Sequence, residues 1–239
     1  MTIPVQLLRS VPVAQDTTAF HFSKPAGFGF KPGQACDLIL PGQAQNNGAD
    51  TRHAFSIVSA PHEDELVFAT RMRDSPFKRA LARLQPGTTM ELDGPFGSLT
   101  LHKKAERAAV FIAGGIGITP FMSMVRHAAH SHSTQPLVLL YSNRRPEDAA
   151  FLTELQALAA AHAPLRLIAT MTDMAHATQP WDGATGAIDS ALLQKIVNGL
   201  DTPIFYVSGP PPMVAALRDT LEAAGIDEDD VRSEEFYGY

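Results

Sequence analysis

The chain has 239 residues with a formal net charge of −6, and 45% of its residues are hydrophobic. This length and apolar content suffice for two hydrophobic cores, so we expect two domains. No apolar run approaches the roughly 20 residues that span a bilayer, and the N-terminus lacks a signal-peptide pattern, so we expect a cytoplasmic protein without membrane insertion. The single cysteine, Cys36, excludes an internal disulfide and any four-cysteine iron–sulfur cluster within this chain.

Basic and acidic side chains are unevenly distributed. Residues 1–105 carry 11 basic and 9 acidic side chains, whereas residues 106–239 carry 8 and 16. Such a chain is not expected to bind nucleic acid. The basic residues of the first part gather at Arg71, Arg73, Lys78, Arg79 and Arg83. This segment could face a phosphate group or an acidic protein, or it could be a solvated surface.

Up to about Leu101 the chain shows short apolar runs separated by turn residues. The runs are Val5–Leu8, Ala19–Phe22, Cys36–Leu40, Phe55–Val58, Leu66–Thr70 and Thr89–Leu92. Pairs of proline and glycine separate them at positions 32–33, 41–42, 86–87 and 94–95. This pattern is typical of antiparallel strands in a small barrel or sandwich. One helix interrupts the strands: Ser75 can cap it, Pro76 can take its first position, and apolar residues follow at helical spacing.

From about Glu106 the pattern changes to alternating strands and helices. The expected strands are 109–113, 137–141, 165–170, 204–208 and 231–236, and the expected helices are 120–129, 147–161, 190–197 and 213–224. This alternation predicts a parallel sheet with helices on both faces. The boundary between the two parts is expected in the polar segment His102–Arg107.

A glycine-rich segment, Gly114–Pro120, follows the buried strand of this second part. Its glycines remove side chains where the backbone bends sharply and can approach a phosphate. Thr119 is expected to cap the next helix, with Pro120 at its first position. Because a helix N-terminus presents unpaired N–H groups and a partial positive charge, the segment predicts a pyrophosphate site. A purely structural turn would use the same residues.

A second loop, Ser208–Met213, also follows an apolar strand and opens a helix. Open parallel sheets bind ligands at the carboxyl ends of their strands. The three prolines of this loop make it stiff, which suits either a shelf for a flat nicotinamide ring or a structural corner.

With these motifs the chain resembles the ferredoxin–NADP⁺ reductase family, which includes flavin reductases and reductase components of oxygenases. The family's motifs appear in order: an Arg-x-Tyr-Ser-like element at His53–Ser56, the glycine-rich loop at 114–120, a Cys-Gly-Pro-Pro-like loop at Ser208–Pro211 and an acidic-aromatic C-terminus at Glu234–Phe236. The resemblance implies a six-stranded antiparallel FAD-binding β-barrel at residues 1–103. It also implies an α/β, Rossmann-like NAD(P)-binding domain at residues 104–239, in a stand-alone member without an iron–sulfur domain.

The resemblance also assigns site residues. The expected flavin site comprises Arg52, His53, Ala54, Phe55, Ser56, Thr70, Arg71, Met72, Ser75, Phe77 and Lys78. The expected dinucleotide site comprises Gly114, Gly115, Gly117, Thr119, Pro120, Asn143, Arg144, Asp173, Ser208, Gly209, Pro210, Pro211 and Met213. The expected catalytic residues are Ser56, which would offer its hydroxyl to flavin N5, Phe236, which would cover the flavin, and Glu234, in a proton or partner relay.

Three positions depart from the family pattern. Histidine stands in the place of the motif arginine, with Arg52 one residue earlier, so either Arg52 or His53 would contact the FAD phosphate. Ser208 stands where many relatives have cysteine. Thr172-Asp173 stands where NADPH-selective relatives have a hydroxyl residue and arginine, which favours NADH; Arg144-Arg145 nearby could instead reach a 2′-phosphate.

The implied reaction is hydride transfer from a nicotinamide to flavin N5, followed by electron release to an acceptor. One hypothesis is a reductase that serves an acidic ferredoxin, flavodoxin or oxygenase. A second is a self-sufficient reductase of free flavin, ferric chelates or quinones, and a third is an electron-transfer or regulatory subunit that uses no nicotinamide. Histidines 127, 130 and 132 lack a carboxylate or cysteine to complete a metal site, so no metal is expected there.

Overall fold

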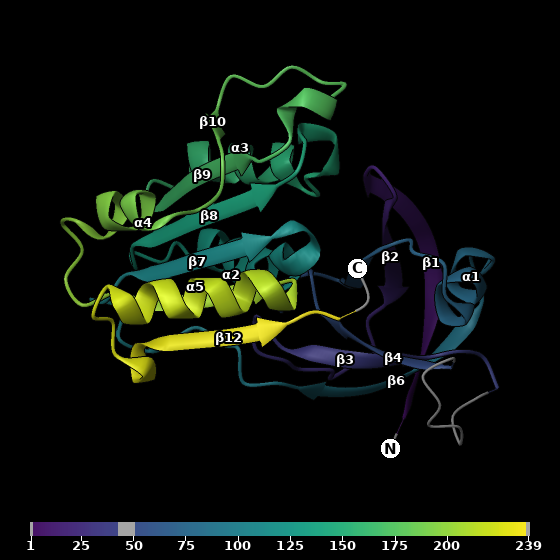
Figure 1. The fold of residues 1–239 in the computed structure, drawn as a ribbon. Coiled ribbons are helices and arrows are strands. Elements are labelled where there is room, and N and C mark those ends of the chain that lie inside the picture. The colour runs from purple at the N-terminus through teal and green to yellow at the C-terminus, as the bar shows by residue number, and fades with distance from the viewer. Residues whose placement is uncertain (1, 43–50, 238–239) are drawn as a thin grey trace.

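The computed structural model describes residues 2–42 and 51–237. The chain forms two six-stranded sheets in succession, the first antiparallel and the second parallel (Figure 1). We call the parts that hold them the first half and the second half. Both predicted sheet classes are confirmed.

The antiparallel sheet has the strand order β4-β3-β6-β1-β2-β5. Its strands are β1 (Ile3–Ala14), β2 (Thr17–Ser23), β3 (Ala35–Ile39), β4 (Arg52–Ser56), β5 (Glu65–Arg71) and β6 (Thr89–Phe96). One isolated bridge joins Ile57, directly after the edge strand β4, to Phe68 of the other edge strand, β5. No continuous ladder joins β4 to β5 among the described residues, so the predicted barrel is not closed.

Helix α1 (Pro76–Ala82) starts as the sequence predicts. Ser75 is its N-cap, accepting a hydrogen bond from the Lys78 N–H at 3.2 Å, and proline takes the first position. The helix buries Phe77 and Leu81 against the inward side chains of the antiparallel sheet. Complete burial of a phenylalanine of this kind contributes about 2 kcal/mol.

The predicted turn at Gly94-Pro95 is wrong, because β6 continues through both residues to Phe96. The pairing of β6 with β3 is irregular between Ala35 and Asp37. A Cβ on Gly94 would lie 2.9 Å from the Cys36 Sγ, so glycine allows the two strands to approach each other here.

The parallel sheet has the order β10-β9-β8-β7-β11-β12. Its strands are β7 (Ala109–Gly114), β8 (Leu137–Asn143), β9 (Leu165–Met171), β10 (Ala184–Thr185), β11 (Ile204–Gly209) and β12 (Val231–Glu235). The chain adds β8, β9 and β10 on one side of β7 and then returns to place β11 on the other side. The strand order therefore reverses between β7 and β11, the point where open α/β sheets bind ligands.

Helices cover both faces of this sheet (Figure 1). Alternate residues of β7 explain the two layers, because side chains on a strand point to opposite faces. Phe111 packs with α2 (Thr119–His130) and α3 (Leu152–Ala161), whereas Val110 and Ile112 pack with α4 (Ser190–Val197) and α5 (Pro211–Ala223).

One predicted helix start and one predicted helix cap are wrong. The helix expected from Glu147 begins at Leu152, because Phe151 adopts the left-handed conformation with φ +61° and interrupts the helix after a 3₁₀ turn at Pro146–Asp148. Thr119 is not the N-cap of α2: a 3₁₀ turn, Gly115–Ile118, precedes the helix, and the Thr119 hydroxyl donates to the Ile116 carbonyl at 3.1 Å.

Candidate functional site

Two loops meet at the point where the strand order reverses. They follow β7 and β11, and they touch through glycines. A Cβ on Gly117 would lie 2.3 Å from the Ser208 carbonyl oxygen, and one on Gly114 would lie 2.4 Å from the Met213 Sδ. Only glycine allows this approach of the two loops.

Gly115 differs from its neighbours. It has a φ of +53°, and a Cβ built on it would meet nothing within 4 Å. The backbone at this position is thus both turned and uncovered, as a loop that approaches a phosphate requires.

A cavity of about 490 Å³ opens between the two halves, and we call it the seam cavity. Its walls come from β4, β5, the start of α1, the turn after β7 and the chain after β12. The lining residues are Ala35, His53, Ala54, Phe55, Ser56, Ala69, Thr70, Arg73, Asp74, Ser75, Lys78, Phe96, Ile116, Thr119, Glu234, Glu235, Phe236 and Tyr237. The sequence therefore brings residues from both predicted sites to one place.

An aromatic cluster forms one wall of the seam cavity. The ring centroids of His53 and Phe55 lie 6.0 Å apart, and Phe77 lies 5.0 Å from His53 and 5.8 Å from Phe55. Phe77 is fully buried beneath the other two rings, which line the cavity. The rings are tilted to one another by 35–57°, and they give this wall an aromatic surface against which a planar ring system could pack.

Two cationic side chains line the same cavity near α1. Lys78 is only 8% exposed, and burial together with the charge of Arg73 lowers its pKa. A buried ammonium group beside another cation favours an anion as its neighbour. This end of the cavity therefore suits a phosphate or diphosphate.

Buried polar atoms without a hydrogen-bond partner among the described residues surround the cavity. The hydroxyl of Ser56 and one carboxylate oxygen of Glu234 belong to residues that line the cavity, whereas the hydroxyl of Ser208 lies one strand behind Glu234. Ser208 and Glu234 are paired residues of adjacent strands β11 and β12, and burial raises the pKa of Glu234. Because buried polar groups normally have partners, these atoms indicate where a ligand with donors and acceptors would bind.

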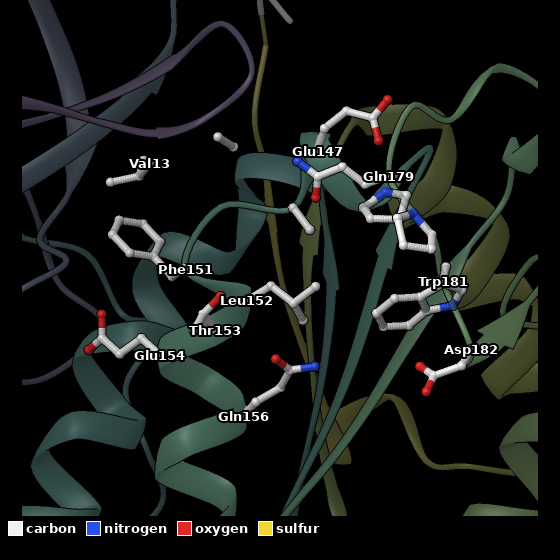
Figure 2. Close-up of a pocket in the computed structure, with 14 residues that line it drawn as sticks. Val13, Glu147, Phe151, Leu152, Thr153, Glu154, Gln156, Gln179, Trp181 and Asp182 are labelled. Carbon is white, nitrogen blue, oxygen red and sulfur yellow. The ribbon is translucent and has the colours of Figure 1, made fainter.

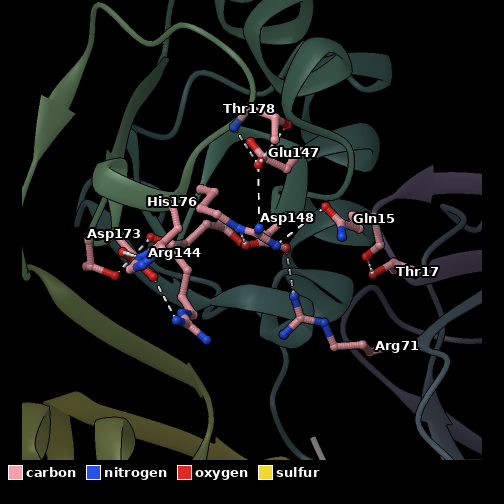
Figure 3. A network of polar contacts seen from close by, with 12 residues as sticks. Gln15, Thr17, Arg71, Arg144, Glu147, Asp148, Asp173, His176 and Thr178 are labelled. Atoms are coloured by element: carbon pink, nitrogen blue, oxygen red, sulfur yellow. Dashed lines mark hydrogen bonds and ion pairs between the residues drawn. The ribbon is translucent and has the colours of Figure 1, made fainter.

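Several predicted residues lie elsewhere. Arg52 pairs with Asp37 at 3.4 Å and with Asp93 at 3.0 Å, so His53 is the member of that pair that lines the seam cavity. Arg71 pairs with Asp148 of the second half at 3.2 Å (Figure 3).

Other predicted residues flank the loops. Met72 packs at the margin of the first-half core. Asn143, at the end of β8, is buried with both amide atoms unpartnered among the described residues. Pro120, in the first turn of α2, is buried, while Pro210 and Pro211 begin α5 beside Gly209.

The two residues predicted to choose between NADH and NADPH are in contact. Arg144 donates to Asp173 at 2.7 Å, and Asp173 also contacts His176 Nδ1 at 2.6 Å. The hydrogen bonds from His176 and Arg144 lower the pKa of Asp173. Arg144 is 71% exposed, whereas Asp173 is 19% exposed.

Sequence reasoning missed part of the cavity wall. Asp74, Phe96, Ile116, Glu235 and Tyr237 line it, although none was assigned to a site. Phe96 and Tyr237 are large hydrophobic side chains with 40% and 76% exposure. Ile116 and Glu235 lie within segments that the sequence did single out, the glycine-rich loop at 114–120 and the acidic-aromatic C-terminus.

A larger groove of about 600 Å³ lies away from these loops, between the end of β1 and the start of α3 (Figure 2). Phe151, Leu152 and Trp181 line it together with acidic side chains. Glu147 already accepts from Thr178, and Glu154 already pairs with Arg126. Among the described residues of this groove one buried polar atom, Glu147 Oε2, has no partner, whereas the seam cavity combines such atoms with an aromatic wall and two cations, so we place the candidate site in the seam cavity.

Neither a metal-binding cluster nor a membrane-spanning helix is found in the described part of the chain. Within residues 2–42 and 51–237, no group of three His, Cys, Asp or Glu side chains is arranged to hold a metal ion. In the same ranges, no helix has the length and apolar character needed to cross a membrane.

Comparisons with known proteins identify the kind of domain in the second half and show relatives over nearly the whole chain. Residues 111–219 match the family model of the oxidoreductase NAD-binding domain. The reductase component of propane 2-monooxygenase from Mycolicibacterium smegmatis is 29% identical over 248 residues, which cover 98% of this chain and 69% of that protein.

Solved structures share the fold over nearly the whole chain. A cytochrome P450 reductase from Amycolatopsis superposes with a TM-score of 0.83 at 22% identity, covering 99% of this chain and 70% of that one. A ferredoxin NADP⁺ reductase from Neisseria gonorrhoeae, solved with bound FAD and NADP, superposes with a TM-score of 0.80 at 23% identity, covering 98% of both chains.

Proposed function

We propose that the chain, which is similar to ferredoxin–NADP⁺ reductase-like oxidoreductases, is an FAD-dependent NAD(P)H reductase with its reaction centre in the seam cavity. The observation that carries this proposal is the unpartnered Ser56 hydroxyl, which lines a cavity with an aromatic wall and two cations. When bound, the flavin would accept a hydride from a nicotinamide and pass electrons on.

The residues present fit a flavin dinucleotide. Phe55 and His53 would pack against its rings, and the buried hydroxyl of Ser56 would donate to a ring nitrogen. Lys78 and Arg73 would neutralise the diphosphate. Phe236 and Glu234 line the opposite side, where they would exclude water from the ring and hold a proton near it.

The nicotinamide dinucleotide would bind across the two loops at the reversal of strand order. The uncovered backbone at Gly115 would approach the diphosphate, and Pro210 with Pro211 would support the nicotinamide end. Thr119, whose side chain lines the seam cavity, would lie between the two cofactors.

We favour NADH over NADPH as the electron donor. Asp173 is held in place by Arg144 and His176, so a carboxylate is fixed where a ribose 2′-hydroxyl could donate to it. A 2′-phosphate would meet this carboxylate or would have to draw Arg144 away from it. Comparison of kcat/KM for NADH and NADPH tests this preference, and a higher value for NADPH would contradict it.

For the acceptor we favour an acidic electron-transfer protein, a ferredoxin, flavodoxin or oxygenase component. The relatives include reductase components of monooxygenases, and exposed Arg73, Arg79 and Arg83 lie beside or near the cavity. Turnover with such a partner should decrease as salt rises, because screening weakens charge pairing. Salt-independent reduction of a quinone or free flavin, without response to a protein partner, would favour a self-sufficient reductase.

Replacement of Ser56 tests the proposed centre. In Ser56→Ala, we expect FAD to bind and its reduction by the nicotinamide to slow about tenfold, the effect of losing one hydrogen bond worth ~1.4 kcal/mol. Ser10→Ala, on an exposed part of β1, is the matched control. Equal reduction rates in both variants would remove Ser56 from the centre.

A further inference from the structure

A charged cluster joins the two halves (Figure 3). Asp148, in the 3₁₀ turn after β8, has a side chain that is 5% exposed. It accepts hydrogen bonds from Arg145 at 2.8 and 2.9 Å and from Arg71 at 3.2 Å. Arg71 is the last residue of β5, so one buried carboxylate holds a cation from each half.

Backbone contacts support the same junction. The Gln15 N–H donates to the Glu147 carbonyl at 2.8 Å, and Arg145 contacts the Gln15 side chain at 3.4 Å. The Met72 N–H donates to the Asp16 carbonyl at 2.6 Å, which ties the end of β5 to the β1–β2 turn. The end of β5 and the β1–β2 turn are therefore connected to each other where they contact the segment around Asp148.

The residues of this junction are close in sequence to residues of the candidate site. Thr70 lines the seam cavity and immediately precedes Arg71. Asn143 ends β8 two residues before Arg145. A shift at Asp148 would therefore move the flavin-side wall relative to the strand ends that form the dinucleotide site.

Other contacts and a shared hydrophobic cluster also join the halves. The Ser123 hydroxyl of α2 donates to the Ser59 carbonyl at 2.7 Å, and Arg232 of β12 donates to the Thr100 carbonyl at 2.6 Å. Arg126 of α2 pairs with Glu63 at 3.4 Å. The contact at Asp148 differs from these because it is a buried carboxylate that holds a cation from each half.

We propose that Asp148 is a positioning residue that fixes the angle between the two halves, and thereby the distance between the flavin and the nicotinamide. This inference rests on the proposed function. Hydride transfer requires the reacting atoms at about 3–3.5 Å, and a displacement of ~1 Å can slow a reaction about 100-fold. Arg71 accordingly acts at the seam, as the partner of Asp148, and does not bind a flavin phosphate.

The test is Asp148→Asn, which removes the charge at nearly constant volume. Anaerobic single-turnover reduction of the FAD-loaded protein is measured against the concentration of the nicotinamide that reduces the wild type, with and without deuterium on the transferred position. We expect the limiting rate to fall about tenfold to 100-fold with a larger isotope effect. The nicotinamide dissociation constant and the FAD content should stay close to the wild-type values.

The matched control is Glu65→Gln, which weakens an ion pair with Arg9 inside the first half and should leave the limiting rate unchanged. Arg71→Gln provides a second variant at the junction if Asp148→Asn does not fold, and the same loss is expected. The double variant should be no slower than the slower single variant, because both changes break one contact.

Two results would overturn the inference. One is a wild-type limiting rate and isotope effect in either folded junction variant. The other is weaker FAD binding in Arg71→Gln with tighter FAD binding in Asp148→Asn, which would place Arg71 on a flavin phosphate. The wild-type protein distinguishes failure of the proposed function from failure of this inference. If neither nicotinamide reduces the FAD of the wild type, the proposed function is wrong, and the inference is wrong with it.

Discussion

Glu234 shows how one buried side chain makes stability depend on pH. Burial raises the pKa of Glu234 in the folded state above that of a free glutamate. Between the pKa of the unfolded state and that of the folded state, the folded protein therefore binds more protons than the unfolded protein. The contribution of this residue to stability therefore decreases as pH rises through that window.

Glu234→Gln removes the titrating group and keeps the shape of the side chain. We expect the free energy of unfolding of this variant, relative to that of the wild type, to increase as pH rises from about 4 to about 8. Urea unfolding in the absence of cofactors measures this difference. Glu222→Gln, at an exposed position of α5, is the control. A difference between Glu234→Gln and wild type that does not change with pH would show that Glu234 titrates normally.

Lys78 has the opposite shift, since burial and the charge of Arg73 lower its pKa. A diphosphate would favour the charged form of this lysine, so FAD affinity should decrease as pH rises through the lowered pKa. Lys78→Gln should weaken FAD binding about tenfold to 100-fold, the range for a hydrogen bond to a charged group of ~1.5–3 kcal/mol. Fluorescence titration with FAD measures both effects, with Lys104→Gln as an exposed control. Unchanged affinity would place the diphosphate elsewhere.

At the scale of elements, the glycine loop after β7 contains two different requirements. Gly117→Ala would put a methyl group 2.3 Å from the Ser208 carbonyl oxygen, forcing the two loops apart. We expect a loss of about 1–3 kcal/mol in the free energy of unfolding. Gly115→Ala meets no neighbour and should cost about 1 kcal/mol through its positive φ, while it weakens nicotinamide binding. Urea unfolding measures the loss of stability in each variant, and NADH titration measures the loss of nicotinamide binding in Gly115→Ala. Unchanged NADH oxidation in Gly115→Leu would remove this loop from the dinucleotide site.

The segment between the two sheets is held by a buried hydrogen-bond network. The Tyr206 hydroxyl, on β11, lies 2.8 Å from both the backbone nitrogen and Nδ1 of His102. Tyr206→Phe leaves these groups without that partner, so we expect a loss of about 1–3 kcal/mol. Thermal and urea unfolding measure the loss, and Tyr237→Phe, at an exposed position, is the control. Equal stability of the two variants would mean that the network contributes nothing.

Local signals in the sequence predicted most elements. The Ser75-Pro76 pair located the start of α1, and alternating apolar runs located the strands of both sheets. The errors have physical causes that lie outside the local pattern. The left-handed Phe151 delays α3, and the 3₁₀ turn before Thr119 puts Ile118 in the N-cap position that Thr119 was expected to take. Strand β10 has only two residues and therefore shows no periodicity.

Site residues that belong to a sequence motif could be predicted from the sequence. Residues whose role depends on a partner far away in the chain could not. His53, Phe55 and Ser56 line the seam cavity as the motif suggested. Arg52 and Arg71 looked equally suitable as phosphate ligands, but carboxylates that are 41 and 77 positions away in the chain hold them. No local pattern reveals such pairings, because they depend on which strands become neighbours.

At the scale of the whole molecule, the two halves share a hydrophobic core. One buried cluster contains Ala19, Val67 and Ala69 of the first half together with Phe121 and Val125 of α2. The division into domains at residues 103 and 104 thus stays a prediction about the chain, whereas the packing joins both parts around the seam cavity. The proposed reaction depends on this joining, because residues of both halves line the seam cavity.

The most direct test of this account is the absorbance of the purified protein between about 300 and 550 nm, after reconstitution with FAD if needed, followed by anaerobic addition of NADH and, separately, NADPH. We expect a yellow protein whose flavin absorbance disappears on addition of a nicotinamide, faster with NADH. A protein that cannot bind FAD, or whose bound FAD is reduced by neither nicotinamide, would contradict the central claim that the seam cavity joins the two cofactors.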